Sequence, residues 1–200
     1  MERIETLAAL FAKFPGIGER QSRRFVYYLL RQRPEYLERL ATQIESIRNN
    51  VIECPFCFRF YEKQEGTPCT LCMKAEDKTI LLVVEKDADL ESLRKSGTYK
   101  GYYFVFGGSI PILEAPAPHV RIQELLTRIE KDKAVLTEVI LAFSLTPAGD
   151  NTDEYVRREL KSILEGTSVR VTSLGRGLST GTELEYSDAQ TILYALKNRQ

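Results

Sequence analysis

The four cysteines of this chain have a spacing that could hold a metal ion. Cys54 and Cys57 form one C-x2-C pair, Cys69 and Cys72 form another, and eleven residues separate the two pairs. Two such pairs facing each other can place four thiolate sulfurs at about 2.3 Å around one tetrahedral Zn²⁺ ion. Because four sulfurs leave no ligand position for water, the predicted site is structural and not catalytic. We expect one zinc ion per protomer.

Two other uses of these cysteines are less favoured by the sequence. The chain shows no signal peptide and no apolar run of the ~20 residues that a membrane span requires. A cytoplasmic location is therefore expected, and there thiols stay reduced and disulfides are rare. A redox C-x-x-C is also less favoured, because two copies on one short hairpin do not resemble a βαβ redox site.

A second candidate site lies in the N-terminal segment. The sequence Pro15-Gly16-Ile17-Gly18 separates two stretches with helical periodicity, residues 4–14 and 19–30. In such a helix-hairpin-helix pattern, Gly16 and Gly18 let the backbone turn tightly and expose amide N–H groups at the start of the second helix, which favours phosphate binding. The basic residues predicted on the first turns of that helix, facing phosphates, are Arg20, Arg23 and Arg24.

The charge of the chain supports this nucleic-acid site only locally. The whole chain has a formal net charge of zero and a pI of about 6.6. Residues 1–50 contain nine Lys or Arg against six Asp or Glu, a surplus of three positive charges. A plain helical hairpin with a solvated basic face is the alternative. Phosphate contacts alone would bind DNA without reading its sequence.

The elements that must position these sites follow from the hydrophobic periodicity. Residues 35–50 are predicted to form a third helix that leads into the cysteine module. The rest of the chain alternates strands at 79–84, 102–106, 139–142 and 168–172 with helices at 89–96, 119–132 and 151–165. This alternation predicts an α/β domain with a mainly parallel sheet. Glu85 follows the first strand, where such sheets place functional residues.

Several motifs in this order resemble the bacterial RecR family of recombination mediators. The stretches that carry the resemblance are "FPGIGERQSRR", "VVEKDADL", "SGTYKGYYFVFGGSIPIL" and "VTSLGRGLSTGTELEYSDAQTILYALKNR", and it covers nearly the whole chain. The resemblance implies four parts: a helix-hairpin-helix DNA-binding domain at 1–53, a C4 zinc finger at 54–75, a Toprim domain with flanking helices at 76–174, and a C-terminal loop and helix at 175–200.

One stretch departs from both the Toprim enzymes and the RecR family. Toprim enzymes resemble one another in an acidic run, D-x-D-x-E-G-E, that binds Mg²⁺, and the RecR family typically keeps N-P-T-x-E-G-E there. In residues 142–150, Ser144, Thr146 and Ala148 replace both aspartates and the first glutamate, and only Asp150 stays acidic.

The acidic remnant, Glu85 and Asp150, together with Asp87 or Asp89, therefore predicts at most a weak Mg²⁺ site. Two-metal phosphoryl chemistry is not expected from these residues.

The resemblance implies a non-enzymatic, DNA-binding mediator of recombinational DNA repair. It would act with RecO, and in many bacteria RecF, to load the recombinase RecA onto strands coated by single-strand-binding protein. The alternative is a Toprim metal-dependent nuclease or topoisomerase-like enzyme, which would need the missing acidic residues. A bare zinc-ribbon interaction protein would leave the Pro-Gly-Ile-Gly hairpin unexplained.

The resemblance also implies self-association. RecR proteins form rings, dimers joined into tetramers, in which hairpin segments of different protomers pair by swapping. The candidates for that packing are Leu7, Leu10, Phe11, Phe25 and Leu29, which could instead form one protomer's own core. The candidates for a second, C-terminal interface are Leu193, Leu196 and Lys197.

Two further features have alternative interpretations. The glycine-rich segment 175–181 could bind phosphate, but a tight loop of the Toprim fold is favoured. The cysteine module contains four aromatic residues that could stack on bases. We expect them instead to form the small hydrophobic core of the module; they are Phe56, Phe58, Phe60 and Tyr61.

Overall fold

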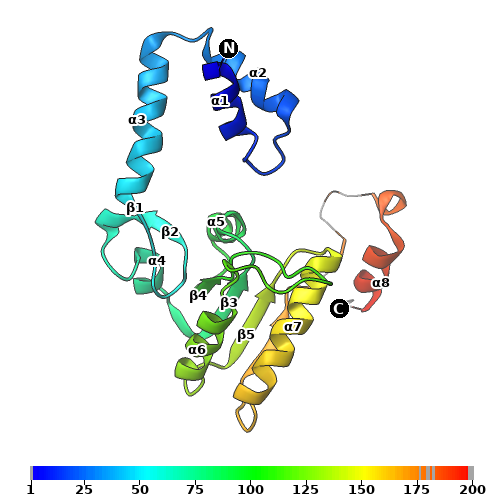
Figure 1. Cartoon of the computed structure of the whole chain (residues 1–200). Helices are drawn as coiled ribbons and strands as arrows, with labels where there is room; N and C mark the ends of the chain where they lie inside the picture. Colours follow the sequence, from blue (N-terminus) through cyan, green and yellow to red (C-terminus); the bar gives the residue numbers. More distant parts are fainter. Residues whose placement is uncertain (1, 176, 179–180, 182, 198–200) are drawn as a thin grey trace. The chain divides into compact units, whose positions relative to one another are not determined.

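A computed structural model of the chain describes residues 2–175, 177–178, 181 and 183–197 (Figure 1). The chain divides into two compact units, Met1–Val51 and Ile52–Gln200. Three positions of the predicted glycine-rich loop, Arg176, Ser179 and Thr180, lie outside the described residues.

The first unit contains three helices, α1 (Glu2–Phe11), α2 (Glu19–Leu29) and α3 (Pro34–Asn50). Helices α1 and α2 pack against each other, with Ala8 of α1 and Val26 of α2 buried. The Phe11 ring meets the Phe25 ring edge-on, with 5.8 Å between centroids. Phe11 and Phe25 therefore contribute to the hairpin's own core in this protomer.

Helix α3 has no buried residue along its whole length. Pro34 occupies its first turn, where a missing N–H costs nothing. The apolar residues of α3 are largely open to solvent, and Ile44 and Ile47 are each 62% exposed. Its apolar face therefore has no covering partner among the described residues.

The second unit begins with the cysteine module. Strands β1 (Val51–Glu53) and β2 (Phe60–Glu62) form a two-stranded sheet, followed by a short 3₁₀ turn, η1 (Lys63–Glu65), and by helix α4 (Thr70–Met73). With three or four residues each, these elements are too short for a hydrophobic period to repeat clearly.

A four-stranded parallel sheet forms the centre of this unit. Its strands are β3 (Asp77–Val84), β4 (Gly101–Val105), β5 (Glu138–Ala142) and β6 (Arg170–Ser173), in the spatial order β4-β3-β5-β6. The helices are α5 (Asp87–Ser96), α6 (Ile122–Asp132), α7 (Pro147–Ile163) and the C-terminal α8 (Ala189–Lys197), with a short 3₁₀ turn, η2 (Leu184–Tyr186), before α8. The predicted α/β fold class is confirmed.

Alternate residues of β3 point to opposite faces of the sheet. Leu81 and Val83 join a core with buried residues of α6 and α7, whereas Leu82 and Val84 pack with Leu90 of α5. This central strand is covered on both faces, which explains its continuous apolar run. None of the described helices is long and apolar enough to cross a membrane.

Helix α7 begins four residues before its predicted start at residue 151. Thr146 caps the helix by accepting a hydrogen bond from the N–H of Gly149 at 3.1 Å, and Pro147 follows in the first turn. A Thr cap followed by proline is a favourable helix start, so the replaced acidic run becomes the beginning of this helix.

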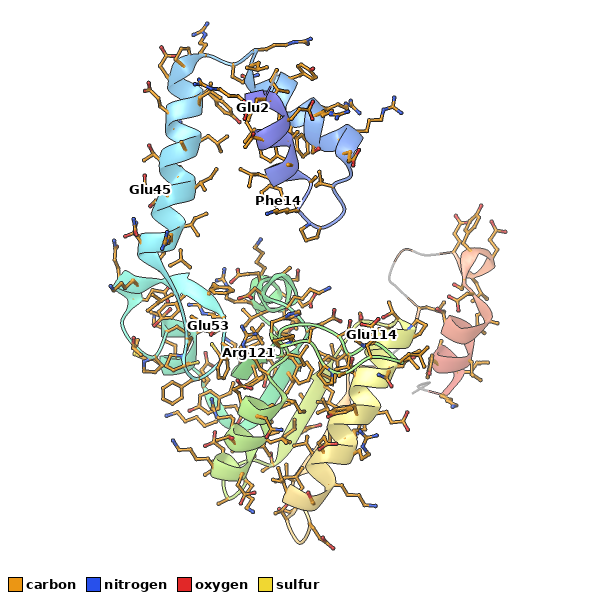
Figure 2. The ribbon with its side chains drawn as sticks, in the orientation of Figure 1. Glu2, Phe14, Glu45, Glu53, Glu114 and Arg121 are labelled. Carbon is orange, nitrogen blue, oxygen red and sulfur yellow. The ribbon has the colours of Figure 1, made fainter. Side chains whose placement is uncertain are left out.

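Two polar contacts connect the cysteine module to the sheet and to the segment before α6. The N–H of Val105 donates to the carbonyl oxygen of Cys57 at 2.8 Å. Glu53 forms an ion pair with Arg121, which precedes α6, and Figure 2 labels both residues.

The aromatic residues of the module divide between core and surface. Tyr61 is buried with the cysteines, and the Phe58 ring packs 5.1 Å from that of Phe104. Phe56 is 41% exposed and Phe60 is 57% exposed. The prediction that all four form the module's core is therefore confirmed only for Tyr61, because Phe58 packs against the core of the sheet and Phe56 and Phe60 are exposed.

Candidate metal centre and nucleic-acid interface

The structure brings the four cysteine sulfurs together in a closed cluster. The sulfur of Cys54 lies 3.9 Å from that of Cys72, and the sulfur of Cys57 lies 3.6 Å from that of Cys69. All four sulfurs lie within 4.8 Å of one another. Four sulfurs at about 2.3 Å from a central Zn²⁺ ion form a tetrahedron with edges of roughly 3.8 Å. The cluster therefore fits a tetrahedral metal ion of this size.

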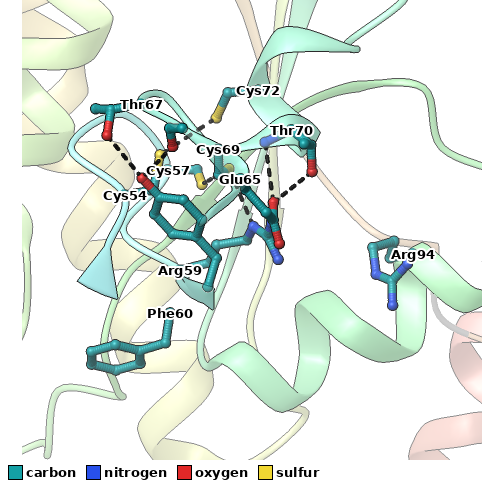
Figure 3. A network of polar contacts seen from close by, with 12 residues as sticks. Cys54, Cys57, Arg59, Phe60, Glu65, Thr67, Cys69, Thr70, Cys72 and Arg94 are labelled. Atoms are coloured by element: carbon teal, nitrogen blue, oxygen red, sulfur yellow. Dashed lines mark hydrogen bonds and ion pairs between the residues drawn. The ribbon is translucent and has the colours of Figure 1, made fainter. Parts of the chain in front are cut away.

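A polar network supports one side of the cluster (Figure 3). The Nε–H of Arg59 donates to the Cys69 sulfur at 3.2 Å, and its Nη2 pairs with Glu65 at 2.8 Å. Glu65 also accepts from the hydroxyl of Thr70 at 2.6 Å, at the start of α4. Arg59 thus places a positive charge beside the predicted site and holds Cys69 and α4 in place.

The same neighbours favour ionisation of Cys69. The pKa values of the Cys57 and Cys72 thiols are raised by the hydrogen bonds that these thiols share with the other cysteines, whereas hydrogen bonds from Cys57 and Cys72, and then from Arg59, lower the pKa of the Cys69 thiol. Since the thiolate is the form that binds a metal ion, this environment suits a ligand sulfur.

The hairpin turn between α1 and α2 is open on its surface. Gly16 has φ +75°, in the left-handed region that favours glycine. Gly18 is the N-cap of α2, and a Cβ atom built at either glycine would meet no other atom within 4 Å. The first amides of α2 are thus not covered by a capping side chain.

The three predicted arginines of α2 have different environments. Arg23 pairs with Glu5 of α1 at 3.1 Å, and Arg24 donates to the side chain of Gln21 at 3.4 Å. Arg20 is exposed and has no hydrogen bond or ion pair with any residue that the structure describes. Arg20 and Arg24 are therefore better available to a ligand than Arg23, which is paired with Glu5 of α1.

Glu85, at the carboxyl end of β3, is only 3% exposed. Its Oε1 pairs with the ammonium of Lys86 at 2.9 Å, and its Oε2 accepts the N–H of Ser144 at 3.3 Å. Burial acts to raise the pKa of Glu85, but the hydrogen bonds from Lys86 and Ser144 outweigh it, so the pKa lies below its ordinary value.

The other acidic residues named from the sequence have structural contacts. Asp87 accepts the N–H of Phe60 at 2.9 Å, and Asp89 caps α5 by accepting the N–H of Lys86 at 3.0 Å. Asp150 lies in the first turn of α7. Across the described part of the chain, the cysteine cluster is the one group of three or more His, Cys, Asp or Glu residues close enough to share a metal ion.

Comparisons with known proteins agree with this architecture. The Toprim domain family matches residues 79–174, and the RecR C-terminal family matches residues 177–200. The recombination protein RecR of Chlorobium limicola is 36% identical over 200 residues, which cover 98% of this chain and 95% of the relative. That of Herpetosiphon aurantiacus is 37% identical over 201 residues, covering 100% of this chain and 94% of the relative.

The chain belongs to the RecR family.

In this RecR-family protein, the carboxyl end of the Toprim sheet does not fit a Mg²⁺ site. Mg²⁺ requires several hard oxygen ligands in near-octahedral order. Both oxygens of Glu85 instead face hydrogen-bond donors, and the hydroxyls of Ser144 and Thr146 lie 3.1 Å apart in a hydrogen bond with each other. A Cβ atom at Gly149 would lie 1.9 Å from the Ser144 carbonyl oxygen, so this loop is closely packed against α7.

Two residues of these sites were missed by the sequence analysis of this RecR-family chain. Arg59 follows Cys57 by two positions, and Lys86 directly follows Glu85. A basic residue next to a predicted thiolate or carboxylate was the available signal, because opposite charges close in sequence can pair. The pattern did not show which of the many nearby acidic and basic side chains would do so.

Proposed function

We propose that this protein is a non-enzymatic DNA-binding mediator of recombinational DNA repair. It acts in the cytoplasm with RecO, and with RecF where that protein is present, to load RecA onto single-stranded DNA. The similarity to recombination proteins RecR supports a role in recombinational repair. The observation that carries DNA binding is the open Pro-Gly-Ile-Gly turn at the start of a basic helix.

The helix-hairpin-helix is the proposed DNA-binding surface. Phosphate oxygens would accept hydrogen bonds from the first amides of α2, shaped by Gly16 and Gly18. Arg20 and Arg24 are four residues apart and therefore share one face of the helix. Arg23 assists through its charge while its ion pair keeps α2 against α1.

A zinc ion is the proposed occupant of the cysteine cluster. Four sulfurs in a closed, buried set are typical of structural zinc, and no ligand position is left for a substrate. The ion would stabilise the module that begins the second unit.

Self-association into a dimer or tetramer ring is part of the proposal. The exposed apolar face of α3 and the exposed Leu10 of α1 support an N-terminal interface, since monomeric surfaces rarely leave such faces uncovered. On α8, Leu193 and Leu196 are each at least half exposed and are the proposed C-terminal contact.

The mediator role predicts faster RecA loading. With RecO present, adding this protein to single strands coated by single-strand-binding protein should shorten the lag before RecA's DNA-dependent ATPase activity appears. The variant with Arg20→Ala and Arg24→Ala is the matched control and should leave the lag long. An unchanged lag with the wild-type protein would contradict the mediator role.

The altered Toprim end predicts no metal-dependent chemistry on DNA. With Mg²⁺ or Mn²⁺, the protein should neither cleave nor relax supercoiled DNA, and should not prime synthesis, because among the described residues no group of three acidic side chains gathers around Glu85. Gel assays at several protein concentrations would measure this, with Glu85→Gln as the control. Cleavage or relaxation that depends on the metal and disappears in Glu85→Gln would overturn the non-enzymatic assignment.

A further inference from the structure

A groove runs between the cysteine module and helix α6, within the second unit. Its volume is about 760 Å³, a size that can hold a small organic ligand or part of a polymer. The residues that matter for its chemistry come from the module, the sheet and α6: Phe56, Pro68, Lys78, Tyr102, Arg128 and Lys131.

Arg128 holds the aromatic wall of this groove in place. Its guanidinium carbon lies 4.9 Å from the Tyr102 ring centroid and 5.9 Å from that of Phe56. Its Nη1 also donates to the carbonyl oxygen of Phe56 at 2.9 Å, and its Nε pairs with Asp132. Arg128 therefore contacts both the backbone and the ring of Phe56, and 41% of Phe56 stays exposed to solvent. A fixed, exposed ring loses little conformational freedom when a ligand stacks on it.

The rim of the groove carries positive charge. Lys78 and Lys131 are exposed, and neither forms an ion pair with any residue in the described ranges. Of the two acidic residues that line the groove, Asp132 is paired with Arg128, which leaves Glu124 as the opposing charge. The groove therefore combines an accessible aromatic ring with two available ammonium groups.

We propose that this groove binds single-stranded nucleic acid, with a base stacked on Phe56 and backbone phosphates on Lys78 and Lys131. Aromatic rings beside basic groups are the common means by which proteins hold unpaired strands. A duplex offers no free base face to Phe56, so the groove selects single strands. The proposal assumes the DNA-binding function proposed above, but it places a second contact surface on the unit that does not contain the hairpin.

The first test compares two exposed phenylalanines of the same module in the full-length protein. Phe56→Ala should weaken binding to a labelled oligothymidylate by roughly 5- to 150-fold per stacked base, as aromatic-to-alanine changes do at such sites. Phe60→Ala is the matched control, because Phe60 is also exposed but does not line the groove. Zinc content and oligomer mass should be the same in both variants. Equal affinity of Phe56→Ala and wild type would overturn the proposal and leave the groove to another ligand, such as an acidic peptide.

The two lysines provide an independent measurement. In the variant with Lys78→Ala and Lys131→Ala, the slope of log affinity against log salt for single strands should fall by about 0.7 for each lost contact. The slope for a blunt duplex should stay as in the wild type. A slope for single strands that does not change would contradict the phosphate contacts.

Photo-cross-linking separates failure of this site from failure of DNA binding itself. An oligonucleotide that contains iododeoxyuridine should form an adduct on the peptide that contains Phe56, identified by mass spectrometry. The adduct should persist in the variant with Arg20→Ala and Arg24→Ala once protein concentration is raised to restore binding. If the wild-type protein binds the strand and every adduct maps to the hairpin, the groove proposal fails alone. If the wild-type protein binds no DNA, the proposed function fails as well.

Discussion

Replacing Cys69 with serine is expected to remove the metal ion and unfold the cysteine module. A structural zinc site supplies about 10–16 kcal/mol of binding free energy in small zinc modules at neutral pH, while a whole domain is stable by only about 5–15 kcal/mol. The damage should extend to the sheet, since Cys57 accepts a hydrogen bond from Val105 of β4. Elemental analysis should show about one zinc ion in the wild type and none in Cys69→Ser, and the variant should aggregate or melt at a much lower temperature.

Arg59→Met is the matched control for this experiment. The variant keeps all four sulfurs but loses the hydrogen bond to Cys69 and the ion pair with Glu65. It should still fold with zinc bound, but its zinc affinity should fall by roughly 10- to 100-fold, as for other outer contacts of metal ligands. A competing chromogenic chelator would measure that affinity. Absence of zinc from reduced, untagged wild-type protein would end the claim that this cluster holds the ion.

The variant with Arg20→Ala and Arg24→Ala is expected to lose most of its affinity for DNA. A hydrogen bond to a charged group contributes about 1.5–3 kcal/mol, so two lost phosphate contacts should weaken binding roughly a hundredfold or more. The slope of log affinity against log salt should flatten by about 0.7–0.9 per lost contact. In a ring the same contacts are repeated on every protomer, and effective concentration enlarges the difference. Fluorescence anisotropy over a salt series would measure both quantities.

Arg48→Ala, at the end of α3, is the matched control for charge in the same unit. It should change the affinity little if the hairpin is the binding surface. Because phosphate contacts read no bases, the wild type should bind different sequences nearly equally. If the double variant keeps its fold and oligomer mass and still binds DNA as tightly as the wild type, the hairpin is not the binding surface.

Local patterns in the sequence were enough to predict the fold class and the cysteine cluster. The C-x2-C spacing restricts how four sulfurs can be arranged, and the continuous apolar run of β3 can be buried only within a covered sheet. Both patterns involve residues that are close together in the chain. The local structure that they predict therefore depends little on which distant segments pack against it. The short elements β1, β2 and α4 gave no comparable signal, because three or four residues span little more than one period of a strand or helix, which is too short for a repeat to stand out.

The tertiary structure alone decided which side chains of the predicted sites are available. Phe56 and Tyr61 are both aromatic and lie five positions apart in the chain. Tyr61 is nevertheless buried with the cysteines, whereas Phe56 lines a groove formed with α6. Likewise, Glu85 is paired with Lys86 and the Ser144 N–H, so both oxygens of a carboxylate placed as a metal ligand already accept hydrogen bonds from other groups. Burial and pairing depend on which surface packs opposite a residue, and part of that surface comes from distant segments, as with Ser144 for Glu85 and α6 for Phe56. Sequence patterns over a few positions therefore determined the elements and the cysteine ligands of this protein, whereas long-range packing determined which groups are left to bind DNA or a metal.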